Sequence, residues 1–193
     1  MAPDAQPSEP PLRADARRNR DALIEAAAAV FAAVGVDAPI KAIAVQAGVG
    51  VGTVYRRFPR RSDLIAAVFR HEVDACALAA EGLAVQYPPF EALAHWIDRL
   101  LDLIITKRGL ASALQSDAPA YAELRADFEA RLAPSLQRLM DAAGRDIRSD
   151  ISARELWRAV ALLCAPAKAS EFDETRKVVG LLVRGLRNSG PSS

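Results

Sequence analysis

Residues 40–58 carry the pattern that most restricts the fold of this chain. Two apolar sets with helical spacing lie on either side of Gly48-Val49-Gly50: Ile40, Ile43, Ala44 and Ala47 come first, and Val51, Val54, Tyr55 and Phe58 follow. Spacings of three and four residues place each set on one face of an α-helix. Gly48 can take the positive φ that ends one helix and redirects the chain. We therefore predict two short helices joined by a tight turn, a helix-turn-helix.

Helical periodicity also dominates the rest of the chain, and no strand-like alternation of β-branched and aromatic residues appears. A first long helix is predicted over residues 15–34, with Gly35 as its C-cap. Later helices are predicted from Ser62 to about Ala84 and from starts near Pro89, Asp117, Ser152 and Ser170. The predicted fold class is all-α, with a three-helix helix-turn-helix DNA-binding domain joined to a larger helical regulatory and dimerisation domain.

Composition and charge divide the chain into three parts. Residues 1–12 are rich in proline and poor in large apolar side chains, which predicts a disordered tail. A DNA-binding domain is expected over 13–60, and a ligand-binding and dimerisation domain over 61–193. The net charge is +1 for the whole chain but about +5 for residues 13–61. A basic excess confined to one segment is typical of a protein of which only one part meets phosphate.

Several other classes of protein are disfavoured by the sequence. Cys76 and Cys164 have neither the spacing of a metal site nor the number of a disulfide framework, so buried thiols in a reducing cytoplasm are expected. The N-terminus lacks a signal-peptide pattern, and no apolar run reaches the length of a membrane span. Because no nucleophile elbow, phosphate-binding loop or metal-ligand cluster appears, we expect no enzyme and no cofactor. His71 and His95 are single histidines, more often structural or exposed than ligand-binding.

The outward side of the second short helix carries groups that suit DNA. Gly52 permits close approach of the backbone, and Thr53 offers a hydroxyl and a methyl group. Arg56 and Arg57 offer donors for guanine in the major groove or for phosphate, and the sequence does not apportion them. Tyr55 can pack its ring while its hydroxyl reaches a phosphate. The alternative is a helical hairpin whose basic face is merely solvated.

Further cations flank this helix. Lys41 lies near the start of the first short helix, and Arg60 and Arg61 follow Pro59. These positions suit contacts with the DNA backbone, and Arg17 and Arg18 could add more. The predicted DNA-binding residues are Lys41, Gly52, Thr53, Tyr55, Arg56, Arg57 and Arg61.

The spacing of specific residues strengthens this prediction. The chain contains Phe31-x3-Gly35, Ile43-Ala44-x2-Ala47-Gly48-Val49-x-Val51-Gly52-Thr53-Val54-Tyr55-x2-Phe58-Pro59 and Asp63-Leu64-Ile65. Over about residues 15–70 this combination closely resembles the DNA-binding domain of TetR-family regulators. The resemblance implies that Thr53, Tyr55, Arg56, Arg57 and Arg61 contact double-stranded operator DNA. It also implies a two-fold dimer, usually a repressor, that a small molecule releases from DNA.

The chain departs from the family pattern at three places. Pro39-Ile40 stands where the family often has Thr or Ser, which puts a helix cap and one phosphate contact in doubt. Arg57 replaces a frequent His, and Arg61 replaces a frequent Lys. Both changes keep or increase the positive charge.

The C-terminal half resembles the family only loosely, so its ligand site is predicted from residue type. We expect a cavity lined mainly by large or polarisable side chains, which would take a small apolar or amphipathic effector. The candidates are Phe69, Trp96, Leu100, Leu103, Leu114, Tyr121, Phe128, Trp157 and Cys164. Plain core packing is the alternative for each of them. A C-terminal half without any cavity would instead indicate an architectural DNA-binding protein.

The last two helices are predicted to form a homodimer contact. Their apolar faces comprise Leu156, Val160 and Leu163 on the earlier helix, and Val179, Leu182, Val183 and Leu186 on the later one. Gly180 and Gly185 are costly in a helix, and close approach of a partner helix would explain both. The last helix could instead pack only within its own subunit. A dimer would space two recognition helices to fit a palindromic operator, about 34 Å apart.

Overall fold

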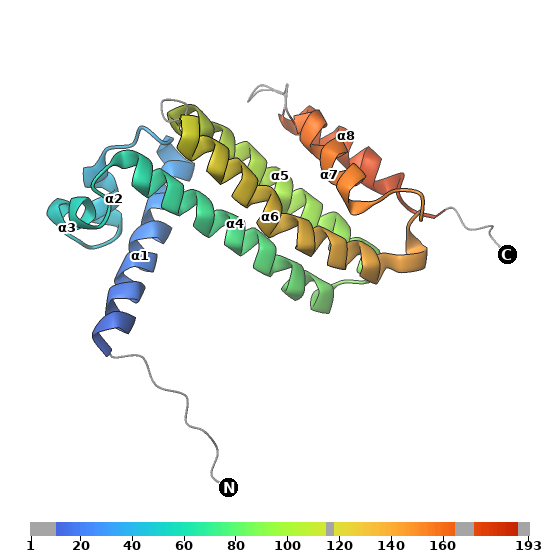
Figure 1. Cartoon of the computed structure of the whole chain (residues 1–193), viewed down its shortest axis with the longest axis horizontal. Coiled ribbons are helices and arrows are strands. Elements are labelled where there is room, and N and C mark those ends of the chain that lie inside the picture. Colours follow the sequence, from blue (N-terminus) through green and yellow to red (C-terminus); the bar gives the residue numbers. More distant parts are fainter. Residues whose placement is uncertain (1–10, 115–117, 165–171, 189–193) are drawn as a thin grey trace, which may run out of the picture. The chain divides into compact units, whose positions relative to one another are not determined.

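The structure, a computed structural model, describes residues 11–114, 118–164 and 172–188 (Figure 1). The side chains of residues 105–126 lie outside that description, as do those of residues 11–16. The named elements are all helices: α1 Pro11–Val34, α2 Ile40–Gln46, α3 Val51–Arg57, α4 Arg61–Gln86, α5 Pro89–Leu114, α6 Ala118–Ala143, the 3-10 helix η1 Gly144–Asp146, α7 Ala153–Cys164 and α8 Phe172–Arg184. This confirms the all-α prediction.

The chain divides into two compact units, residues 1–68 and residues 69–193. The division falls inside α4, between Val68 and Phe69, so that one continuous helix belongs to both units. Of the predicted tail, residues 1–10 lie outside the described residues, whereas Pro11 and Leu12 open α1. The domain limits expected from the sequence, 13–60 and 61–193, stay predictions.

The first unit is built around an apolar core supplied by α1, α2, α3 and the start of α4. Its buried side chains include Leu23, Ile24, Ala27, Phe31, Ile43, Ala44, Val54, Phe58, Leu64 and Ile65. Gly35, at φ 95°, ends α1 and donates its N–H to the carbonyl of Phe31. The left-handed conformation costs a glycine little, so the chain can leave α1 there and start α2.

The turn between α2 and α3 is a Schellman motif centred on Gly48. This glycine has φ 65° and donates its N–H to the Val45 carbonyl, and the N–H of Val49 reaches the Ala44 carbonyl at 2.9 Å. The two bonds satisfy carbonyls at the end of α2 that would otherwise lack donors. Gly50, with ordinary negative φ, then caps the start of α3. The helix-turn-helix predicted from residues 40–58 is therefore present.

The second unit is a helical bundle in which α5 packs against α6 and α8, and α7 packs against α6 and α8. Trp96, Leu93, Leu100, Leu132, Leu136 and Leu156 are among its fully buried side chains. The indole Nε1 of Trp96 donates a hydrogen bond to the Cys76 carbonyl, which joins α5 to α4. Ion pairs from Arg176 to Asp98 and Asp102 fasten α8 to α5.

Candidate DNA-binding site

The helix α3 presents most of its surface to solvent. Of its seven residues only Val54 is buried, and Phe58 directly after the helix is buried as well. Five of the seven predicted DNA-binding residues are exposed, namely Lys41, Gly52, Tyr55, Arg56 and Arg57, while Thr53 and Arg61 are partly buried. The two arginines occupy the last turn of α3. This exposed polar surface over a buried apolar support is what base and phosphate contacts require.

The apolar support of α3 is narrower than its sequence spacing suggested. Val51 was expected on the inward side, but 38% of it is exposed, and 52% of Tyr55 is exposed. Val51 is the first residue of a two-turn helix, so little of the first unit's core extends over it. Val54 and Phe58 alone therefore anchor α3, and Tyr55 is free to use both its ring and its hydroxyl at the surface.

Arg61 has a structural task that the sequence did not reveal. Its guanidinium donates to the carbonyls of Val36 and Ala38, the latter at 2.6 Å, and lies 6.0 Å from the ring centroid of Phe31. One side chain at the start of α4 therefore fixes the connection between α1 and α2. Its contact with DNA stays a prediction. This role could not be predicted from local sequence, because the acceptor carbonyls lie more than 20 residues before Arg61.

The start of α4 is stabilised by Asp63. Its carboxylate accepts the backbone N–H of Arg60 at 3.1 Å and pairs with the Arg60 guanidinium at 2.8 Å. These hydrogen bonds, above all the one from the Arg60 side chain, lower the pKa of Asp63 below its ordinary value. A carboxylate in the first turn also interacts favourably with the helix dipole.

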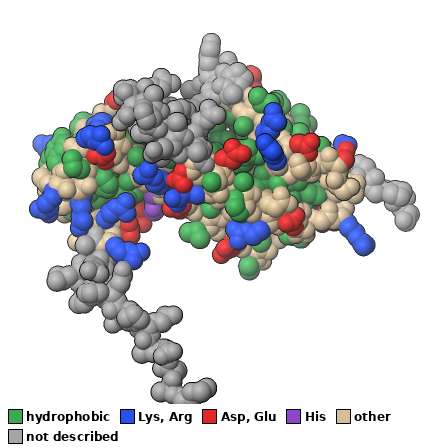
Figure 2. All heavy atoms as spheres, viewed as in Figure 1, with side chains coloured by type: hydrophobic (Ala, Val, Ile, Leu, Met, Phe, Trp, Pro, Cys, Tyr) green, Lys and Arg blue, Asp and Glu red, His purple; other side chains and the backbone are tan. Residues whose placement is uncertain are grey.

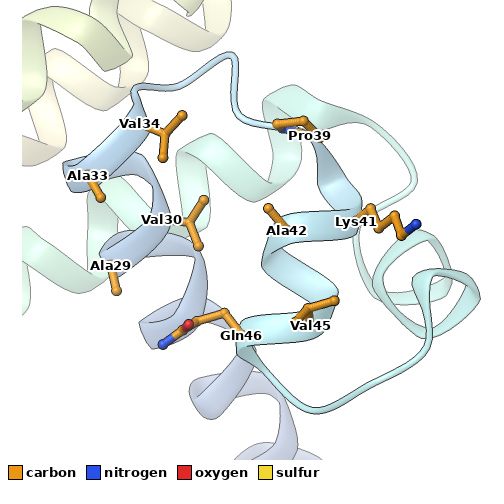
Figure 3. Close-up of a pocket in the computed structure, with 9 residues that line it drawn as sticks. All are labelled: Ala29, Val30, Ala33, Val34, Pro39, Lys41, Ala42, Val45 and Gln46. Carbon is orange, nitrogen blue, oxygen red and sulfur yellow. The ribbon is translucent and has the colours of Figure 1, made fainter.

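The start of α2 lacks a side-chain cap, as its Pro39-Ile40 sequence suggested. Pro39 is the N-cap and makes no side-chain hydrogen bond. Beside it, an open groove of about 720 Å³ runs between α1 and α2 (Figure 3). The groove is mainly apolar and is lined by Ala29, Val30, Ala33, Val34, Pro39, Lys41, Ala42, Val45 and Gln46. Lys41 is its only charged lining residue, and no predicted effector residue lies in it.

Positive charge gathers on the first unit. Figure 2 shows several Lys and Arg side chains over the surface formed by α1 and α3. Arg17, Arg18 and Arg20 are exposed on α1, and Arg56 and Arg57 are exposed on α3. The basic excess found in the sequence is therefore displayed outward on the same unit as the helix-turn-helix, as binding to a polyanion requires.

The predicted effector residues do not all come together. Phe69 of α4, Phe128 of α6 and Trp157 of α7 form a chain of ring contacts, with centroids 5.9 Å and 5.4 Å apart. Phe69 and Phe128 are buried as well, and Trp96 is fully buried and hydrogen-bonded, which is core packing. The remaining described candidates, Leu100, Leu103 and Cys164, are buried too, while the side chains of Leu114 and Tyr121 lie outside the described residues. An effector cavity stays a prediction.

Most of the face predicted for dimer contact is buried within the single subunit. Five of its seven side chains, Leu156, Val160, Val179, Val183 and Leu186, are at most 4% exposed. Side chains this buried offer little surface to a partner, and their part in a dimer contact stays a prediction. Leu163 and Leu182 are half-buried.

A different apolar face of α7 and α8 is exposed. Leu162, Val178 and Leu181 are 69%, 45% and 62% exposed, respectively. An adjoining groove of about 420 Å³ between the two helices is lined by Arg148, Ile151, Glu155, Leu156, Ala159, Leu182, Gly185 and Leu186. Sequence spacing missed this face because both helices carry apolar residues on two sides.

Within the described ranges, no three His, Cys, Asp or Glu side chains are grouped so as to hold a metal ion. The helices of those ranges also include none with enough length and apolar character to cross a membrane.

Comparison with known proteins decides the family. Residues 23–68 match the family of bacterial regulatory proteins called tetR, and residues 88–188 match the C-terminal domain of SbtR-like transcriptional regulators. The chain belongs to the TetR family. It is therefore a DNA-binding transcriptional regulator, and its helix-turn-helix is the family's DNA-binding element.

Solved structures of TetR regulators align with nearly the whole of this chain. A TetR regulator from Streptomyces coelicolor is 35% identical with a TM-score of 0.76, and the alignment covers 89% of this chain and 99% of that one. A TetR regulator from Mycobacterium vanbaalenii is 32% identical with a TM-score of 0.72, covering 92% and 100%. A transcriptional regulator of Staphylococcus aureus is 29% identical over 107 residues, which span 54% of this chain and 58% of that relative.

Proposed function

We propose that this TetR-family protein is a homodimeric repressor that binds a palindromic operator and leaves it when a small apolar or amphipathic effector binds. The observation that carries the proposal is the exposed surface of α3, where Thr53, Tyr55, Arg56 and Arg57 surround a buried Val54. A helix of this kind suits the major groove, where Arg pairs with guanine and a Thr methyl meets thymine.

A second copy of the chain supplies the partner in this proposal. The exposed face of α7 and α8, with Leu162, Val178 and Leu181, is the surface that a two-fold related copy would cover. Burying such side chains removes apolar area from water, which favours association by about 25 cal/mol per Å² before the costs of ordering. The two recognition helices of such a dimer then both face the DNA, at the spacing of the two half-sites of a palindrome.

The effector is expected near the ring chain of Phe69, Phe128 and Trp157. These residues come from three different helices, α4, α6 and α7, so a ligand among them would contact all three. A structural neighbour from Mycobacterium smegmatis, 23% identical, is described in complex with proflavine. That complex supports the expectation of a flat, largely apolar effector here, and proflavine is a reasonable first probe.

Footprinting on the DNA upstream of the chain's own coding region tests the DNA-binding part. We expect a protected palindrome and an affinity that falls steeply as salt rises, because phosphate contacts release counterions. Arg56→Ala should weaken binding by about 1–3 kcal/mol if it reads a base, with relaxed preference at that position. If Arg56 holds a phosphate instead, binding should weaken equally for all sequences.

Arg99→Ala provides a matched control. Arg99 is also an exposed arginine, but it lies on α5 in the second unit and lines neither of the two grooves described above. Its loss should leave operator affinity unchanged. If Thr53→Ala and Arg56→Ala both bind DNA as the unaltered protein does, α3 is not the recognition helix and the proposal is wrong.

A further inference from the structure

The first part of α3 carries an apolar surface that the core of the first unit does not cover. Val51, the first residue of the helix, is 38% exposed, and Tyr55 one turn later is 52% exposed. Gly52 is exposed as well, and a Cβ added to it would meet no described atom within 4 Å. We call Val51, Gly52 and Tyr55 the α3 apolar patch. It lies wholly within the first unit and ends where the two arginines of α3 begin.

The fold itself gives little reason for a valine at position 51. Val54 and Phe58 are buried and hold α3 on the core, whereas Val51 leaves more than a third of its surface in water. A β-branched side chain is also a poorer helix former than alanine or the long charged residues. Because neither burial nor helix propensity favours Val51, its exposed methyl groups are better suited to an apolar contact outside the chain.

The position of Val51 indicates what that contact is. An isolated exposed valine is ordinary on a protein surface. In a helix-turn-helix, however, the N-terminal residues of the second helix are the ones that meet base edges in the major groove. Val51 is the first of these residues in α3, and Gly50 and Gly52 on either side carry no side chain that would hold the backbone away from a base.

One group in the major groove suits this patch. Base edges present hydrogen-bond donors and acceptors there, and the one apolar group among them is the methyl on C5 of thymine. The Val51 side chain has no donor or acceptor to offer the polar edges. It gains from covering a methyl group, because that contact removes apolar surface of both partners from water. A cytosine methylated at C5 carries the same group.

We propose that the α3 apolar patch reads the C5-methyl group of a pyrimidine, with Val51 as a specificity-determining residue of the operator complex. The inference rests on the proposed operator binding and adds the chemistry of the sequence that is bound. Arg56 and Arg57 follow Val51 by five and six residues, which is about 8 Å along the helix axis. Each half-site should therefore place the methyl group about two to three base pairs from the guanine or phosphate that an arginine holds.

The size of the effect follows from the area of one methyl group. Burying a group of this size shifts an equilibrium by about fourfold. Loss of the methyl should therefore weaken binding about fourfold in one half-site. The two half-sites of a palindrome are far enough apart for their losses to multiply, so a change in both should weaken binding about 15-fold.

Deoxyuridine tests the methyl group directly, because it lacks the C5 methyl of thymine and keeps every hydrogen-bonding group. Each thymine of a footprinted half-site is replaced in turn, and the affinity of the unaltered protein is measured by fluorescence anisotropy. We expect one position at which the affinity falls about fourfold. A duplex with C5-methylated cytosines distinguishes the second source: if methylation raises the affinity while deoxyuridine has no effect, methylcytosine is the base that the patch reads.

Val51→Ala completes a double-mutant cycle with the altered DNA. The variant should bind the thymine operator about fourfold more weakly and should no longer distinguish thymine from deoxyuridine. Alanine is the better helix former, so the variant should fold, which urea unfolding checks. The matched control is Val34→Ala, because Val34 is an exposed valine of the same unit at the end of α1. Its loss should leave both affinities unchanged.

Thr53 also carries a methyl group, and Thr53→Ser separates its contribution from that of Val51. The deoxyuridine effect should persist in Thr53→Ser. If it vanishes there and persists in Val51→Ala, Thr53 reads the methyl group and the assignment to Val51 is wrong. Binding that ignores both deoxyuridine and cytosine methylation overturns the inference and leaves the proposed function intact. A protein that does not bind the upstream DNA at all would overturn the proposed function, and this inference with it.

Discussion

At the scale of single residues, Trp96 and Cys76 illustrate how burial controls chemistry. Removal of the thiol from water raises the pKa of Cys76 to about 11. At pH 8 only about one thousandth of this thiol is ionised, and the thiolate is the reactive form. We expect dithionitrobenzoate to react with neither Cys76 nor Cys164 in the native protein, since both are buried, and to titrate both after unfolding in guanidinium.

Trp96→Phe should make the Cys76 thiol react at a measurable rate in the native protein. The substitution removes the indole donor, so the Cys76 carbonyl keeps only its bond within α4. The lost hydrogen bond should cost about 0.5–1.5 kcal/mol of unfolding free energy, with faster thiol modification through local opening. Trp157→Phe is the control, because Trp157 is only partly buried and its ring contact with Phe128 survives in part. Equal stability of the two variants would contradict a structural hydrogen bond at Trp96.

Arg61 yields a second prediction at this scale. Arg61→Ala should lower the stability of the first unit by about 1–3 kcal/mol, because the carbonyls of Val36 and Ala38 lose their donor. Arg61→Lys should recover only part of this loss, since an ammonium does not reproduce the planar fork of a guanidinium. Thermal unfolding measures both. A destabilisation equal to that of Arg60→Ala, which removes an exposed pair with Asp63, would contradict the special role of Arg61.

The residues on α3 were easier to predict than Arg61. The periodicity of residues 51–58 placed Arg56 and Arg57 outside and Val54 and Phe58 inside, as the structure has them, although it also placed Val51 and Tyr55 inside, where the structure exposes both. Local spacing decides these positions. The partners of Arg61 and Trp96 are set by contacts between distant segments, and no local pattern encodes them.

At the scale of elements, the turn after α2 depends on one glycine. Gly48 has φ 65°, where any side chain is strained, whereas Gly50 has φ −74°. Gly48→Ala should therefore destabilise the helix-turn-helix by about 1 kcal/mol or more. Gly50→Ala meets no atom within 4 Å and no strain, so it should be much milder. Urea unfolding of the two variants makes the comparison, and an equal loss would show that conformation at Gly48 is not the cause.

The start of α7 shows a reciprocal cap between Ser152 and Glu155. The Ser152 backbone N–H donates to the Glu155 carboxylate at 2.8 Å, and the Glu155 N–H donates to the Ser152 hydroxyl at 3.3 Å. Hydrogen bonds from the Ser152 side chain and backbone lower the pKa of Glu155 from its ordinary 4.5. This is the capping box typical of S-x-x-E sequences.

The sign of its pH dependence follows from that shift. Because the folded pKa is the lower one, the cap stabilises α7 fully above the unfolded pKa and loses this effect as pH falls through the folded value. Ser152→Ala should move the pKa of Glu155 back up and cost about 1 kcal/mol near neutral pH. Side-chain NMR titration follows Glu155, and an unchanged pKa would refute the cap.

Caps of this kind explain why the starts of α4, α5, α6, α7 and α8 could be predicted to within two residues, whereas α1 begins at Pro11, four residues before its predicted start. Ser152, Pro89 and the segment after Gly35 are local signals that fix where a helix begins. The faces of α7 and α8 could not be predicted in the same way. Both helices have apolar residues on two sides, and only the packing of the whole bundle decides that Leu156 and Val179 point inward while Leu162 and Leu181 point outward.

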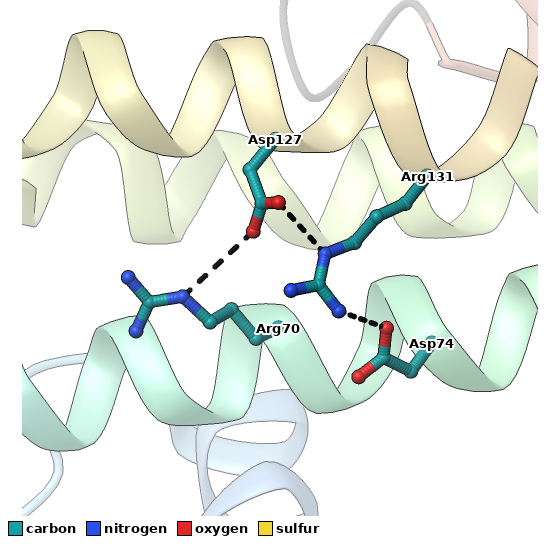
Figure 4. A network of polar contacts seen from close by, with 4 residues as sticks. All are labelled: Arg70, Asp74, Asp127 and Arg131. Atoms are coloured by element: carbon teal, nitrogen blue, oxygen red, sulfur yellow. Dashed lines mark hydrogen bonds and ion pairs between the residues drawn. The ribbon is translucent and has the colours of Figure 1, made fainter.

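At the scale of the whole molecule, the two halves differ in how far sequence could predict them. The first half has one task, so its charge, spacing and family resemblance all indicate the same helix-turn-helix. In the function proposed above, the second half forms a core, a dimer contact and an effector site from similar apolar residues. Their division among these tasks depends on the tertiary structure, and so do the ion pairs between α4 and α6 (Figure 4), whose partners are 57 residues apart.

The exposed apolar face of α7 and α8 provides the last prediction. Leu181→Glu and Leu162→Glu each place a charge on a side chain that is more than 60% exposed in the single subunit, so the subunit itself should fold normally. In a dimer that buries this face, the same charge loses its hydration, which is costly without a partner. We therefore expect both variants to sediment as monomers at micromolar concentration, and the unaltered protein to sediment as a dimer under the same conditions.

Leu78→Glu is the control for this experiment, because Leu78 is equally exposed, at 67%, but lies on α4. It should remain dimeric. Since a palindrome requires two linked recognition helices, the monomeric variants should also lose most operator affinity without any change in α3. Variants that stay dimeric would show that the subunits meet elsewhere, whereas monomers that bind the operator at full strength would show that this protein does not need two-fold symmetry to read it.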